Sequence, residues 1–143
     1  MILVRKLILL SGLIAFHLGS EKCTSGEISY QGRITQNDQA GGLFAGINGF
    51  FKFAIVDSTG KTTHWSNDLS STGGGEPNKS VRVSFPEKNG VFQVSLGGVQ
   101  MTPLGPSVFN QPETYLRIWF SPDGEEFDLL IIFIPNILHK IIQ

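Results

Sequence analysis

The sequence predicts an all-β protein, an antiparallel β-sandwich of about seven short strands that follows an N-terminal signal segment. Apolar and polar side chains alternate along several short runs, which is the period of a strand with one buried face. Turn-forming residues separate these runs, and the chain contains 17 glycines and 7 prolines. No stretch repeats its apolar residues with a helical period. Short alternating strands between tight turns are typical of a jelly-roll-like or immunoglobulin-like sandwich.

Residues 1–25 are predicted to be a signal peptide or an N-terminal anchor. Arg5 and Lys6 precede a mostly apolar run over residues 7–18, which matches the basic and hydrophobic regions of a secretory signal. The run is shorter than the roughly 20 apolar residues that a membrane-spanning helix needs. We therefore expect a secreted or cell-surface protein that meets a membrane only through this segment, if it is not cleaved.

Residues 27–134 are predicted to form the β-sandwich domain, and residues 135–143 a C-terminal tail. Residues 27–34 form the first strand, in which Gly32 marks a bulge or a close approach of another part of the chain. Residues 49–57 form the densest β-type run of the sequence. We expect this run at the centre of the fold.

The central run places Phe51, Phe53 and Ile55 on one face of a strand, because side chains alternate with period two. Three large apolar groups on one face require a covering layer. Lys52 lies on the opposite face, which predicts that this face meets solvent or a thin loop. Residues 61–67 are expected to return as the hairpin partner of this strand.

The middle of the chain predicts a loop followed by a hairpin. The glycine-rich residues 68–78 are expected to form a flexible surface loop that does not pack. Residues 79–85 and 91–96 are expected to pair with each other, because Asn89 and Gly90 between them are a strong hairpin signal.

The last part of the domain predicts one helical turn and two strands. Residues 106–110 can form a single turn of helix that directs Phe109 into the core. Residues 113–120 alternate as a strand, and residues 126–134 form the final strand, which becomes apolar on both faces.

Charge and cysteine content exclude some classes of function. The formal net charge is −1 and the sequence contains no basic run, which argues against a nucleic-acid surface. Cys23 is the only cysteine, so an intrachain disulfide is impossible. We expect the core to be held by packing alone.

The sequence contains no recognisable set of catalytic or metal-binding residues. His17, His64 and His139 lie far apart, without the spacing of a clustered metal site. The acidic residues after Pro122 do not follow the spacing of a calcium loop. The serines stand in no nucleophile-elbow motif. We therefore expect a protein that is not an enzyme and needs no metal or cofactor.

Several segments resemble one family of exported proteins. The segments are ISYQGRI at residues 28–34, GFFKFAIVD at 49–57, HWSN at 64–67, NGVFQVSLG at 89–97 and YLRIWF at 115–120. Together they resemble the "YQGRL"-type β-sandwich head of uncharacterised exported bacterial proteins. The resemblance covers residues 27–130. It implies a structural or surface role, because such heads precede fibre-like or tail-fibre-like regions, and it supplies no catalytic residues.

The end of the sequence departs from that resemblance. Heads of this family continue through a proline-containing linker into a longer protein, whereas this chain runs through the apolar residues 130–135 and stops soon after. An apolar strand left exposed favours aggregation. Either the last strand is buried and the tail packs on it, or the chain is a truncated relic of a longer protein. We prefer the second interpretation.

Two functions remain for such a domain. The first is a non-catalytic exported structural or assembly module, the head of a surface or fibre-like protein, which associates with itself or with cell-surface components. The alternative is a carbohydrate-binding β-sandwich whose exposed aromatic rings stack on the faces of a glycan. The candidate binding residues are Trp65, Trp119 and Tyr115, with Tyr30 as a further ring.

Overall fold

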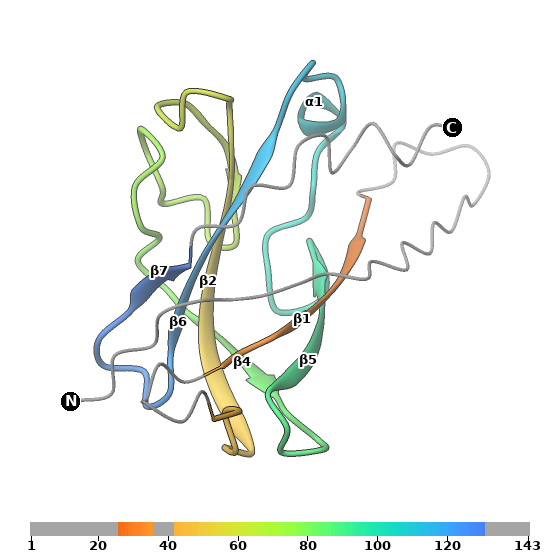
Figure 1. Cartoon of the computed structure of the whole chain (residues 1–143). Helices are drawn as coiled ribbons and strands as arrows, with labels where there is room; N and C mark the ends of the chain where they lie inside the picture. The colour runs from red at the N-terminus through yellow and green to blue at the C-terminus, as the bar shows by residue number, and fades with distance from the viewer. Residues whose placement is uncertain (1–25, 36–41, 131–143) are drawn as a thin grey trace.

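The computed structural model describes residues 26–35 and 42–130, and in these ranges the protein is all-β. Its strands pair antiparallel in a sheet of five and a sheet of two. Figure 1 shows how the labelled strands are arranged. The predicted fold class and strand number are therefore confirmed for the described residues. The predicted signal segment, residues 1–25, and the predicted tail, residues 135–143, lie outside the described residues, as does the end of the last strand.

The elements follow one another in a simple order along the chain. They are β1 (Ile28–Arg33), β2 (Asn48–Val56), β3 (Thr63–Ser66), β4 (Val81–Ser84), β5 (Val91–Leu96), the short helix α1 (Pro106–Phe109), β6 (Tyr115–Ser121) and β7 (Asp128–Leu130).

Strand β2 is the centre of the five-stranded sheet, as the sequence predicts. It pairs with β6 from Phe50 to Val56, and β6 in turn pairs with β7. Strands β3 and β4 also pair with β2, at its two ends. Because β6 occupies one edge of β2 along most of its length, β3 and β4 must share the other edge. The predicted hairpin between β2 and β3 is confirmed.

The second sheet contains only β1 and β5. Their register runs without a shift from Ile28 opposite Leu96 to Arg33 opposite Val91. Gly32 therefore marks a close approach and not a bulge. A Cβ atom on Gly32 would lie 2.8 Å from the ring of Phe92, so the ring packs directly on the backbone of β1.

The predicted hairpin between β4 and β5 is wrong, because the two strands belong to different sheets. The connection, residues 85–90, is longer than a two-residue hairpin turn, and both Lys88 and Gly90 have positive φ. At its end the carbonyl of Gly90 accepts a hydrogen bond from the backbone N–H of Ile34. The chain thus crosses from β4 in the large sheet to β5 in the small sheet, and the connection joins the two layers.

The space between the sheets is filled mainly by phenylalanine rings. The Phe51 ring is fully buried, and its centroid lies 4.5 to 6.0 Å from the centroids of four other rings, those of Phe53, Phe85, Phe92 and Phe120. Phe85 comes from the chain just after β4 and Phe92 from β5, so the two strands once expected to pair in one sheet face each other across the core.

Helix α1 contributes a different residue to this core than the sequence predicts. Val108 is buried, whereas Phe109 is half-buried and packs at the edge of the cluster. A Cβ atom on Gly26 would lie 2.7 Å from the Phe109 ring. The ring therefore covers the backbone that leads into β1 instead of entering the core.

Replacing Phe51 should remove the contact between the layers. We expect Phe51→Ala to lower the free energy of unfolding by about 3–5 kcal/mol, because the substitution leaves a cavity among four rings. Phe50→Ala is the matched control, since Phe50 is half-buried and its side chain is on the other face of β2. Chemical denaturation of both variants measures the difference, and equal losses would contradict the central role of Phe51.

Candidate functional site

The outer face of the large sheet, which looks away from the phenylalanine core, is covered by the loop of residues 68–79. Lys52 of β2 forms an ion pair with Glu76 of this loop. Arg117 of β6 donates a hydrogen bond to the carbonyl of Gly74. The thin loop cover predicted for the Lys52 face is therefore present. The expectation that this loop does not pack is wrong.

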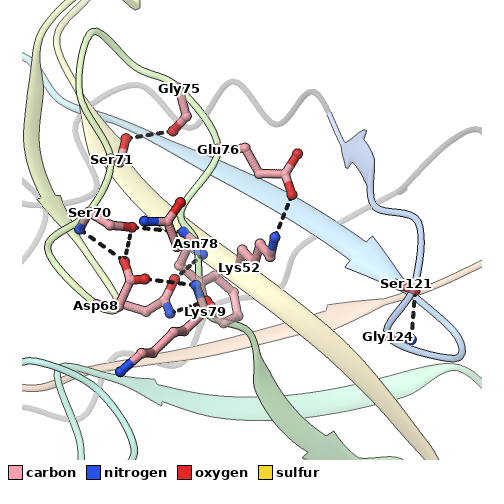
Figure 2. A network of polar contacts seen from close by, with 12 residues as sticks. Lys52, Asp68, Ser70, Ser71, Gly75, Glu76, Asn78, Lys79, Ser121 and Gly124 are labelled. Atoms are coloured by element: carbon pink, nitrogen blue, oxygen red, sulfur yellow. Dashed lines mark hydrogen bonds and ion pairs between the residues drawn. The ribbon is translucent and has the colours of Figure 1, made fainter.

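The loop is held by side chains that bond to its own backbone, as Figure 2 shows. The carboxylate of Asp68 accepts hydrogen bonds from the N–H and hydroxyl of Ser70, at 3.0 and 2.6 Å, and from the N–H of Lys79 at 2.7 Å. Ser71 donates its hydroxyl to the carbonyl of Gly75. The two ends of the loop are thus fixed to each other without regular secondary structure.

Asn67 connects this loop to the central strand. Its side-chain oxygen accepts a hydrogen bond from the N–H of Phe53, and its amide nitrogen donates one to the carbonyl of Lys79. Asn67 is 4% exposed. A buried amide that satisfies two backbone groups is costly to replace, because either group would lose its partner.

Lys52 is a buried cation with two partners. Its Nζ lies 2.5 Å from Oε1 of Glu76 and 4.1 Å from the centroid of the Phe127 ring. The Lys52 side chain is 10% exposed and that of Glu76 is 42% exposed. The pair therefore sits at the boundary between the covered face and solvent, where the lysine depends on the loop for its counter-ion.

Like Asp68, other aspartates accept hydrogen bonds that stabilise a turn. Asp57 accepts hydrogen bonds from Thr59, Lys61 and Thr62 in the turn between β2 and β3. Desolvation raises the pKa of Asp57, but these hydrogen bonds outweigh it and lower the pKa to about 2. Desolvation likewise opposes the hydrogen bonds that lower the pKa of Asp68. Hydrogen bonds from Glu125 and Ser121 lower the pKa of Asp123 in the turn after β6.

Both tryptophans proposed to bind a glycan are buried. Trp65 is 2% exposed, belongs to the main core and donates its indole N–H to the carbonyl of Thr102. Trp119 is 5% exposed and packs with Ala54 and Val56 on the outer face of the large sheet. Neither ring presents a face on which a sugar could stack. The glycan hypothesis required both rings to be exposed, and this expectation is wrong.

The two tyrosines do not form an exposed binding surface either. Tyr115 is half-buried and packs against the cluster around Trp119. Tyr30 is 4% exposed and belongs to the main core. Its hydroxyl has no hydrogen-bond partner among the described residues, and burial raises its pKa. The structure thus does not bring the four aromatic candidates together on one surface.

A groove of about 580 Å³ opens between β4 and β5. The two strands are edges of different sheets, so the groove lies at the open side of the sandwich. Its walls come from both strands and from the turn that follows β5, including Val81, Val83, Val91, Gln93 and Met101. Three charged residues border it, Glu27, Arg82 and Glu87. The groove therefore offers apolar surface and strand edges together.

Sequence reasoning missed this groove because it paired β4 with β5. If the two strands formed a hairpin, their facing edges would be used by each other. The available signal was the length of the connection, residues 85–90, which contains Pro86 and separates the two strands by more than a tight turn requires.

The other chemical groups noted in the sequence do not assemble. In the described ranges no three histidine, cysteine or acidic side chains come close enough to hold a metal ion. His64 is half-buried in β3, and the other two histidines and Cys23 lie outside the described residues. The described part of the chain also contains no helix with the length and hydropathy needed to cross a membrane.

Comparison with known proteins gives one match. A family model described as a domain of unknown function (DUF8740) matches residues 29–130. No curated protein and no solved structure matches the chain. The matched residues begin in β1 and end with β7, so the family model covers nearly all of the described fold.

The turn carboxylates predict a loss of stability in acid. Asp57, Asp68 and Asp123 bind protons less readily when folded than when unfolded, so protonation favours the unfolded chain. We expect the free energy of unfolding to fall as the pH drops from 3.8, the ordinary aspartate value, to about 2. Asp57→Asn should lose less over this interval, because its amide does not titrate.

Denaturant unfolding of the wild-type protein and the variant across these pH values measures the effect. Glu113→Gln serves as the control, because Glu113 is exposed and takes no part in these turns. Identical pH dependence in Asp57→Asn and the wild-type protein would refute the role of Asp57.

The ion pair under the loop predicts unequal effects of its two partners. Glu76→Ala should lower the free energy of unfolding by about 1–2 kcal/mol, because it leaves a buried cation without its carboxylate, while the exposure of Glu76 limits the loss. Lys52→Met should be nearly neutral, since it replaces the charge with an apolar chain of similar length. The double variant should resemble Lys52→Met in thermal unfolding, and a fully stable Glu76→Ala protein would contradict this account.

Proposed function

The chain belongs to the DUF8740 family, and from this premise we propose that it is a non-catalytic structural or assembly module. It acts as an exported head domain of a surface or fibre-like protein, secreted or held at the cell surface, where it associates with itself or with surface components. One observation carries the proposal: the polar side chains of the described residues form hydrogen bonds that stabilise turns and loops, and they do not form a reactive site.

The carboxylates give the clearest support. Asp57, Asp68 and Asp123 each accept backbone N–H groups of their own turn or loop. Groups used in this way have lowered pKa values, whereas a general acid at neutral pH requires a raised one. These aspartates are therefore suited to shape the surface and poorly suited to transfer protons.

The resemblance to exported heads supports the same function. The segments that carry it coincide with structural elements: ISYQGRI with β1, GFFKFAIVD with β2, NGVFQVSLG with β5 and YLRIWF with β6. They supply the two sheets and the rings between them. A pattern of this kind specifies a fold, and a rigid fold with little polar chemistry suits a module that holds other parts in place.

The glycan alternative has no comparable support. It depended on exposed aromatic rings, and Trp65 and Trp119 are both buried. We therefore propose only the assembly function.

The assembly function predicts specific association. We expect the full chain to form a defined oligomer or to retain defined components of a bacterial envelope fraction, because an assembly module must bind something. Size-exclusion chromatography with light scattering measures the first, and a pull-down with the immobilised chain measures the second. A protein unfolded by heat before immobilisation is the control. A folded chain that stays monomeric and retains nothing above that control would refute the proposal.

A further inference from the structure

Strand β5 has an unprotected edge. It pairs only with β1, and its sequence, VFQVSL, contains no charge and no proline. Natural proteins protect edge strands with charged side chains, prolines, bulges or covering loops, because an open edge can pair with another chain. The register between β1 and β5 also contains no bulge.

The other edge strands each have such protection. Arg33 lies in β1, Arg82 in β4 and Asp128 in β7. Strand β3 is four residues long, and its Thr63 hydroxyl accepts a hydrogen bond from Gly74 of the covering loop. Among the described strands, β5 is therefore the edge most open to another strand.

The hydrogen bonds around β5 show which of its backbone groups point outward. The N–H of Ile34 bonds to the carbonyl of Gly90 in the ladder that joins the two strands. Hydrogen-bonded positions alternate along an antiparallel ladder. The positions in phase with Gly90 are Phe92, Val94 and Leu96, so these residues bond to β1. The N–H and carbonyl groups of Val91, Gln93 and Ser95 consequently point away from β1.

Two of these six outward groups have partners within the chain. The N–H of Val91 donates to the side chain of Asn89, and the carbonyl of Ser95 accepts from the N–H of Gly98. Four groups remain without a partner among the described residues: the carbonyl of Val91, both groups of Gln93 and the N–H of Ser95.

The four free groups of one β5 strand match the four free groups of β5 in a second copy. If two β5 strands lie antiparallel with Gln93 opposite Gln93 of the second copy, the two Gln93 residues exchange a pair of hydrogen bonds. Val91 of each copy then lies opposite Ser95 of the other, and the Ser95 N–H donates to the Val91 carbonyl. All four free groups of each copy are used, and the two groups already bonded are not needed.

From this match we infer that β5 is a self-association surface, at which a second copy of the chain adds its own β5 antiparallel, centred on Gln93. The two small sheets merge into one four-stranded sheet in the order β1-β5-β5-β1. The partner strand also lies over the mouth of the groove between β4 and β5. This inference rests on the proposed assembly function and assigns it a surface, a partner and a register.

A pair of proline variants tests the edge. Gln93→Pro removes an N–H that the single chain does not use, so the protein should fold but lose the dimer. Gln31→Pro is the matched control: Gln31 lies directly opposite Gln93 in the β1–β5 register and is also exposed, and its N–H points away from β5. Light scattering of the full chain should give a dimer for the wild-type protein and Gln31→Pro, and a monomer for Gln93→Pro. Circular dichroism checks that both variants are folded.

A cysteine variant tests the register without disturbing the edge. In a Cys23→Ser background, Gln93→Cys should form a disulfide-linked dimer under mild oxidation. Directly opposite residues in a hydrogen-bonded antiparallel pair have Cα atoms about 5.5 Å apart, which lies within the usual range for a disulfide. Gln31→Cys in the same background should stay uncrosslinked. A non-reducing gel measures both, and it does not depend on how Gln93→Pro folds.

The outcomes of these experiments distinguish this inference from the proposed assembly function on which it rests. A wild-type dimer that survives Gln93→Pro, or cysteine variants that crosslink equally, would overturn the β5 surface and leave assembly through another surface intact. A wild-type monomer that retains envelope components would do the same. A wild-type protein that associates with nothing would overturn both.

Discussion

The packing of one ring between two unequal sheets is the constraint on which the fold depends. A two-stranded sheet is marginally stable alone in water, so β1 and β5 require the larger sheet beneath them. The connection is aromatic: the rings of Phe51 and Phe92 lie 4.5 Å apart between centroids, and Phe92 also presses on the backbone at Gly32. These contacts fix the position of the small sheet, and they therefore also fix the position of the free edge of β5.

The sequence predicted which residues point inward far better than which strands pair. Alternation identifies the inward side of a strand from its own residues, and this succeeded for β2, β4, β5 and β6. Pairing depends on distant strands. Val83 and Phe92 can be buried equally well whether β4 and β5 pair in one sheet or face each other from two sheets. The local signal at Asn89 and Gly90 therefore could not distinguish a hairpin from a connection between layers.

The candidate sites were hidden for related reasons. The order of the loop of residues 68–79 comes from contacts such as those of Asp68 with Lys79 and Lys52 with Glu76, which composition does not show. Burial of Trp65 and Trp119 depends on segments distant in sequence that cover them. The open edge of β5 could be recognised only after its partner was known, because unpaired backbone groups are a property of the sheet and not of the strand.

The pairing of β1 with β5 also bears on how the chain folds. The first strand finds its neighbour only after three other strands have intervened, so the smaller sheet closes across a long loop of chain. Folds dominated by such distant pairings form slowly, because the loss of chain entropy precedes the contacts that compensate for it. During synthesis β1 consequently stays without its partner strand until β5 has been made, whereas the hairpin of β2 and β3 needs only the residues between them.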